Sequence, residues 1–304
     1  MSARVSLVHA MGRAAAKRPA EMRVAGQRVA AIVLGGLALA AAAARADDFW
    51  LVPNAFNVGP RSTVVVRGQT SSRFPTSKAA VAIDRIADAR LISKGRSEAV
   101  ANFGTDGNSL ILRHRPRRAG QYVVAVSLKP RALRESVPGF LRYLELEGAT
   151  EARARLEREG VLAARDSVTR RYAKYAKTLV QVGRGGPRAF GAIAGHPLEL
   201  VPARDPATLR SGDTLRVRLL FQGKPLPNAH LSANAVVHSQ DIGGEPVSVA
   251  PDTALVTDGS GAVLLRIGAA GVWNVRGVHI APAAAGSGAD WDTHWVSIVF
   301  HVTR

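Results

Sequence analysis

Residues 212–221 read GDTLRVRLLF, and this stretch indicates the fold more clearly than any other part of the chain. After the Gly-Asp turn, apolar side chains occupy alternate positions, at Leu215, Val217, Leu219 and Phe221. Alternation with a period of two is typical of a β-strand that buries one face. Residues 222–228 contain two prolines and predict a turn, and residues 229–237 predict the next strand.

The same pattern continues on both sides of this stretch. Further strands are predicted at 198–201, 262–267, 272–280 and 295–302, separated by turns rich in Gly, Pro and Asp. These six short strands over roughly a hundred residues are close to the seven of an immunoglobulin-like sandwich, so the segment is expected to be an immunoglobulin-like or transthyretin-like sandwich. We therefore expect residues 196–304 to form a C-terminal antiparallel β-sandwich domain.

Residues 47–182 predict a second β domain with a helical insert. Short apolar runs between 48 and 129 predict the strands of an antiparallel sandwich. Residues of about 138–177 are rich in Glu, Arg, Leu and Ala at helical spacing, which predicts two or three helices. Their apolar stripe includes Leu141, Leu144 and Leu156, and we expect it to pack on this first β domain. The Gly-rich residues 183–195 are expected to be the linker between the two domains.

The first 46 residues resemble a leader. Val29 to Ala44 carry no charged side chain, and the run is shorter than the about 20 residues that a membrane helix needs. Ala44-Arg45-Ala46 offers the small residues that a signal peptidase reads. We expect residues 1–46 to be a signal peptide, with Met22 as an alternative start, and the mature protein to be periplasmic or secreted without a membrane span. The alternative is an anchor helix that is never cleaved.

The amino-acid composition of the chain excludes several kinds of functional site. The chain contains no cysteine, which excludes disulfides, thiolate metal sites and cysteine nucleophiles. The formal net charge is +18 and aromatic residues make up 5%. In an exported protein this charge favours anionic envelope polymers or lipid headgroups as partners, and not nucleic acid. Solvated arginines in a generally basic proteome remain the alternative.

Four phrases carry a family resemblance. They are ADDFWLVP at 46–53, RYAKYAKTLV at 171–180, GHPLELVP at 195–202 with GKPL at 223–226, and DWDTHW at 290–295. Together they resemble the bacterial DUF4198 family of exported proteins, which is described in connection with nickel and cobalt uptake. The resemblance implies a periplasmic accessory to transition-metal uptake, with a metal-uptake transporter or another envelope component as partner. Family members commonly begin His-Asp-Phe-Trp, whereas this chain has Asp47 in place of the histidine.

A metal site would have to consist of histidines and carboxylates. The densest group lies near the C-terminus, and we select His279, Asp290 and His294 as candidate ligands. His279 and Asp290 flank the loop 281–289, so they are expected to face each other across its base. Such ligands suit zinc, nickel or copper, but no compact ligand spacing is present. The alternative is that these are polar residues at strand ends and turns, and Trp291 beside them is a candidate for ligand contact.

Catalytic motifs are missing from the sequence. There is no Gly-x-Ser-x-Gly nucleophile elbow, and residues 183–187 lack the Gly-Lys-Ser/Thr ending of a phosphate loop. We therefore expect an exported, non-enzymatic binding protein, in metal uptake by the resemblance. The alternative is a structural or adhesive envelope module that binds an anionic polymer or a partner protein. An enzyme built on a metal site is the third possibility.

Overall fold

The computed structural model describes residues 47–160, 162, 165–238 and 246–303. The expected signal peptide at 1–46 lies outside these residues. No helix within the described ranges is both long enough and apolar enough to span a membrane. The chain is mainly β, with several antiparallel sheets, which confirms the predicted fold class.

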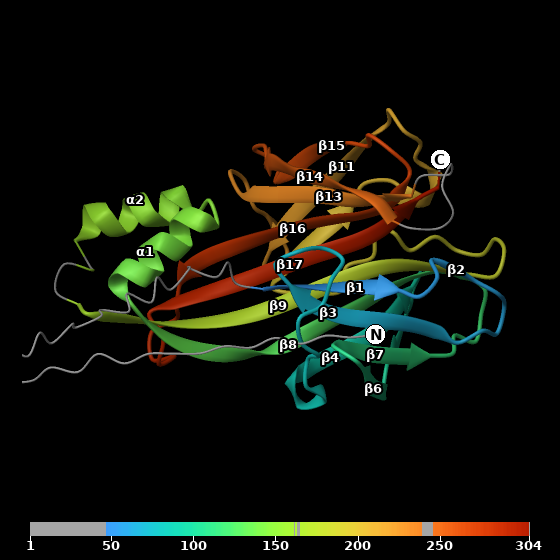
Figure 1. Cartoon of the computed structure of the whole chain (residues 1–304), viewed down its shortest axis with the longest axis horizontal. Coiled ribbons are helices and arrows are strands. Elements are labelled where there is room, and N and C mark those ends of the chain that lie inside the picture. Colours follow the sequence, from blue (N-terminus) through green and yellow to red (C-terminus); the bar gives the residue numbers. More distant parts are fainter. Residues whose placement is uncertain (1–46, 161, 163–164, 239–245, 304) are drawn as a thin grey trace, which may run out of the picture. The chain divides into compact units, whose positions relative to one another are not determined.

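A nine-stranded sheet is the centre of the fold (Figure 1). Its order is β14-β13-β16-β17-β9-β8-β4-β5, with the short β2 also paired to β9. The strands are β2 (Asn57–Val58), β4 (Ile86–Ser93), β5 (Arg96–Ala99), β8 (Gly120–Ser136), β9 (Ser167–Val182), β13 (His230–His238), β14 (Pro246–Val256), β16 (Gly271–Pro282) and β17 (Trp291–Val302).

Strands β9 and β17 join the two halves of the chain. They pair in parallel from Trp291↔Arg170 to Val299↔Thr178, whereas β8 pairs with β9 antiparallel on its other side (Figure 1). The expected boundary at 183–195 is therefore not a break in the sheet. The two expected sandwiches share one central sheet, and the described residues belong to one compact unit.

Two smaller sheets cover opposite faces of the central sheet. One consists of β1 (Asp48–Pro53), β3 (Val64–Ser71), β7 (Ser109–His114) and β6 (Asn102–Asp106). The other consists of β10 (Leu198–Pro202), β11 (Thr214–Phe221), β12 (Lys224–Pro225) and β15 (Ala262–Arg266). Strand β9 serves both cores, because successive side chains of a strand point to opposite faces. Ala176 and Val180 pack against the first sheet, and Tyr175 and Leu179 pack against the second.

Strand β11 is the strand predicted from the alternation. Leu215, Val217 and Leu219 are buried in the core under the second small sheet, and Phe221 is partly buried against it. Two 3₁₀ turns, η1 (Ile83–Arg85) and η2 (Pro206–Thr208), connect strands at the edges of these layers.

The helical insert is shorter than expected and packs on strands of both halves of the chain. It consists of α1 (Val137–Leu146) and α2 (Thr150–Glu159), and residues 167–177, predicted as helix, belong to β9. Residues 167–177 form a strand instead of a helix because alternate side chains of β9 are buried in two different cores. Leu144 and Leu156 are buried in one cluster with Val168 of β9 and with Ile280, Trp291 and Trp295 of β16 and β17. The predicted packing on the first β domain is therefore confirmed only in part, because the stripe contacts β9 of that domain and also two strands of the C-terminal half.

Candidate functional site

Two of the three candidate metal ligands lie together. The hairpin register places His279 of β16 directly opposite His294 of β17, and the ring of Phe221 lies 4.4 Å and 5.3 Å from the two imidazole rings. His294 Nδ1 is 3.3 Å from the hydroxyl of Tyr175. Burial lowers the pKa of His279 to about 4 and also lowers the pKa of His294. Both imidazoles are therefore neutral at physiological pH.

Asp290 does not join this pair. The same register sets Pro282 opposite Trp291, so Asp290 lies at the end of the hairpin and not opposite His279. Its Oδ2 accepts a hydrogen bond of 2.8 Å from the Thr169 amide and its Oδ1 lies 2.5 Å from Arg165 Nη1. These two contacts, the amide first, lower the pKa of Asp290. In the part of the chain that the structure describes, no group of three or more His, Asp or Glu side chains is placed to hold a metal ion.

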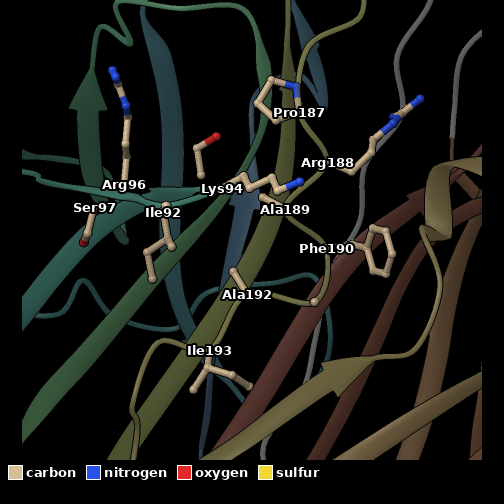
Figure 2. Close-up of a pocket in the computed structure, with 13 residues that line it drawn as sticks. Ile92, Lys94, Arg96, Ser97, Pro187, Arg188, Ala189, Phe190, Ala192 and Ile193 are labelled. Carbon is tan, nitrogen blue, oxygen red and sulfur yellow. The ribbon is translucent and has the colours of Figure 1, made fainter.

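A basic recess lies on another part of the molecule. It has a volume of about 870 Å³ and lies between the β4–β5 turn and the segment 187–193 (Figure 2). Its cationic side chains are Lys94, Arg96 and Arg188, and no Asp or Glu is among the described residues that line it. The recess therefore presents positive charge to solvent.

Two of the three cationic side chains in the recess have no counter-ion among the described residues. Lys94 and Arg96 are exposed and form no ion pair within the described ranges. Figure 2 shows Lys94 extended from the β4–β5 turn toward the segment that carries Pro187 and Arg188. Arg188 Nη1 lies 2.9 Å from Asp205 Oδ2, so its charge is partly balanced. Lys94 and Arg96 are thus the groups with most capacity to bind an anion.

Apolar side chains line the rest of the recess. Ile92, Pro187 and Phe190 contribute to it, and Ile193 is 53% exposed at its margin. Ile193, Phe190 and Pro187 thus contribute apolar surface at separate points of the recess, which a ligand can cover. The recess therefore suits a ligand that combines anionic groups with apolar faces.

The buried side chain of Gln121 holds one wall of the recess in place. Its Oε1 accepts hydrogen bonds from the amides of Ala189 and Phe190, at 2.9 Å and 2.8 Å. Its Nε2 donates to Asp205 Oδ1 at 2.9 Å, and its own amide donates to Pro187 O at 2.9 Å. Gln121 thus holds residues 187–190 of the segment that was expected to be a linker.

A buried ion pair holds the other end of the same wall. Lys177 Nζ of β9 lies 2.7 Å from Glu199 Oε1 of β10 and donates to Ala192 O at 3.0 Å. Glu199 accepts from the amides of Ala194 and Gly195, at 2.6 Å and 3.0 Å. The wall is therefore preformed before any ligand arrives.

The packing of this wall of the recess requires a glycine at position 186. Gly186 has φ +82°, and a Cβ there would lie 2.6 Å from Ala119 O and 2.7 Å from Gly120 Cα. No larger residue fits without moving the backbone. The Gly-rich composition of 183–195 reflects close packing and not a free linker.

Sequence reasoning missed the recess. Its available signal was Lys94-Gly95-Arg96, a basic turn with no acidic neighbour between Ile92 and Ser97. The opposite wall comes from residues about ninety positions later in the chain, and its proximity depends on the shared sheet.

Comparison with solved structures gives only distant similarities. The adhesin InvE of Yersinia pseudotuberculosis is 15% identical, with 84% of this chain and 58% of that chain covered and a TM-score of 0.20. The D0-D1 domain of intimin is 9% identical over 84% and 97% of the two chains, with a TM-score of 0.18. The Escherichia coli adhesin FdeC is 14% identical over 86% and 65%, with a TM-score of 0.22. Because these TM-scores are low, the similarities carry no argument about fold or function.

Family membership rests on a different comparison. No curated protein matches the chain. The model of the family described as "Domain of unknown function (DUF4198)" matches residues 44–281, which include both walls of the recess and His279. The chain therefore belongs to the DUF4198 family.

Proposed function

We propose that this chain is an exported, non-catalytic binding protein of the cell envelope, and that its ligand is an anionic polysaccharide. The observation that carries the proposal is the lining of the recess between 92–97 and 187–193. Lys94, Arg96 and Arg188 are among the residues that line about 870 Å³, and no acidic residue is among the described lining residues. Carboxylate or phosphate groups of a polymer would pair with these cations.

The apolar part of the lining favours a polysaccharide over a purely ionic polymer. Phe190, Pro187 and Ile193 offer a surface on which the C–H faces of sugar rings can pack. The preformed wall supports this role as well, because a rigid site loses little conformational entropy on binding.

Alginate, a polymer of uronic acids, is a suitable probe, with neutral dextran as its uncharged counterpart. We expect the protein to bind alginate and not dextran, with an affinity that falls as salt rises, because exposed charges are screened. Exposed charge pairs contribute about 0.2–1 kcal/mol each, so Lys94→Gln with Arg96→Gln should weaken binding about 2-fold to 30-fold.

The matched control removes two other exposed charges. Arg218 of β11 and Arg266 of β15 are exposed and form no ion pair in the described part of the chain. Arg218→Gln with Arg266→Gln changes the net charge equally and should leave alginate affinity within about 2-fold. A larger loss in this control than in the recess variant would assign binding to the face of β11 and β15 and contradict the proposal.

Transition-metal binding is a second candidate, favoured by the opposed neutral imidazoles of His279 and His294. The metal would be nickel, copper or zinc, and the protein would then act as an accessory to a metal-uptake transporter. Titration of each metal into metal-free protein, repeated with His279→Ala, tests it. Binding tighter than about 100 μM that His279→Ala abolishes would support this function. No binding, or an unchanged affinity in the variant, would exclude the pair as a metal site.

Export is part of the proposal and has its own test. The Ala44-Arg45-Ala46 sequence predicts cleavage that leaves Asp47 as the first residue. N-terminal sequencing of protein from the envelope fraction should begin at Asp47, whereas a retained leader would favour the anchor alternative.

A further inference from the structure

A second cavity lies between the central sheet and the loop 80–85, on the face that β1 and β3 cover. It has a volume of about 220 Å³, and its lining includes Arg85, Arg131, Tyr172 and Lys174. No acidic side chain contributes to it among the described residues. A water molecule occupies about 30 Å³, so the cavity has room for a small molecule of several heavy atoms.

The strand register brings these side chains together. Lys174 of β9 is opposite Leu128 of β8, and Tyr172 is opposite Arg131, with an irregularity in β8 between the two pairs. Tyr172 and Lys174 are two residues apart and therefore share a face of the strand. Lys174 Nζ is 5.9 Å from the centre of the Tyr172 ring.

Arg85 is fixed at the edge of this cavity with one donor unused. Its Nη2 donates to Lys129 O at 2.9 Å. Its Nε is buried and has no hydrogen-bond partner among the described residues. A buried donor without a partner is unfavourable, so an acceptor at this position would stabilise the site.

The nearest carboxylates are already engaged by other cations. Asp48 Oδ2 lies 3.0 Å from Arg276 Nη1, and Asp47 Oδ1 lies 2.8 Å from Lys78 Nζ. Lys174 Nζ donates to the backbone oxygen of Asp47 and not to its carboxylate. Burial lowers the pKa of Lys174 to about 8, the charges of Asp48 and Asp47 oppose this shift, and the charge of Arg85 adds to it.

We infer that Arg85, Arg131 and Lys174 form a binding site for a small oxyanion, either a phosphate or a carboxylate. The site is separate from the recess and does not depend on the function proposed for it. Guanidinium and ammonium groups around one cavity would donate charge-assisted hydrogen bonds to the anion, and the hydroxyl of Tyr172 is available as a further donor.

Calorimetric titration of the full chain with inorganic phosphate, glycerol 3-phosphate and acetate, at constant ionic strength, tests the site. We expect at least one of these anions to bind. If glycerol 3-phosphate binds as tightly as phosphate, the site accepts the phosphate ester end of a larger molecule. Preference for inorganic phosphate would identify the free ion as the ligand. Preference for acetate would identify a carboxylate. No binding of any of the three below about 10 mM would overturn the inference.

Three variants complete the test. Lys174→Met and, independently, the exposed Arg131→Gln remove one charge each; Lys174→Met should weaken binding about 10-fold to 150-fold, and Arg131→Gln about 1.4-fold to 5-fold because its charge is solvated. Arg134→Gln is the control, because Arg134 lies on the same strand, is exposed and is absent from the cavity lining. If Lys174→Met fails to fold, Arg131→Gln still decides the question. Equal affinity in Arg131→Gln and Arg134→Gln would contradict the assignment.

Discussion

Lys177 and Glu199 form an ion pair in the core, with Nζ and Oε1 2.7 Å apart and side chains that are 1% and 2% exposed. The pair connects the central sheet to β10, and both partners also bind the backbone of 192–195. A buried charge needs a partner and further hydrogen bonds, and this pair has both. It thereby links the stability of the fold to the position of one wall of the recess.

Removal of one partner should be strongly destabilising. Lys177→Met leaves the Glu199 carboxylate buried without its cation, and the free energy of unfolding should fall by about 3–5 kcal/mol. The double variant Lys177→Met, Glu199→Met should recover most of this loss, since no lone charge remains. Arg155→Gln, which removes an exposed pair with Glu159, should change stability by less than about 1 kcal/mol. Urea denaturation measures all three, and a single variant as stable as the control would contradict the role of the pair.

The helical insert supplies a second test of packing. Leu144 is fully buried against β16 and β17, so Leu144→Ala should lower the free energy of unfolding by about 2–5 kcal/mol. Leu146 on the same helix is 40% exposed, and Leu146→Ala should have an effect below about 1 kcal/mol. Equal effects of the two variants would mean that α1 does not pack as described.

Acid should destabilise the protein through its buried histidines. Burial lowers the pKa of His196 to about 4, and both of its ring nitrogens lack partners among the described residues. His279 has a similarly lowered pKa. In the unfolded chain these groups titrate near 6.5, so between pH 6.5 and 4 the unfolded state binds protons that the folded state does not. The free energy of unfolding therefore falls as pH drops through this window, by about 3 kcal/mol for His196 alone.

Replacement of the imidazole isolates this effect. His196→Phe keeps an aromatic ring beside Tyr175 and should flatten the pH dependence of stability between pH 6.5 and 4. His230→Phe, at an exposed position, is the control and should keep the slope of the unmodified protein. Urea midpoints at several pH values report the difference, and parallel slopes for the unmodified protein and His196→Phe would refute it.

The part of the fold that local patterns determine could be predicted from the sequence. The alternation in 214–221 predicts β11 because both its burial and its period are properties of the strand itself. Residues 167–177 belong to the stretch of about 138–177 that predicts helices because Glu, Arg, Leu and Ala recur there at helical spacing. Their strand conformation depends on β8 and β17, and the β17 residues lie more than a hundred positions away.

The candidate site likewise combines features that the local sequence determines with features that depend on distant strands. The pairing of His279 with His294 follows from the length of one hairpin, which the sequence leaves open by a few residues. The fixed wall at 187–195 depends on Gln121 and Lys177, whose burial arises from the parallel junction of β9 and β17. Glycine content alone therefore predicted a linker where tertiary hydrogen bonds produce a wall.

The most direct test of the proposed function is amide hydrogen exchange with and without alginate. If the recess is the binding site, protection should increase in residues 92–97 and 187–193 when alginate is added, and dextran should have no effect. Strands β11 and β15, whose outer faces carry Arg218 and Arg266, should exchange at the same rate in both conditions. Protection confined to β11 and β15, or none in the two walls of the recess at saturating alginate, would contradict the account.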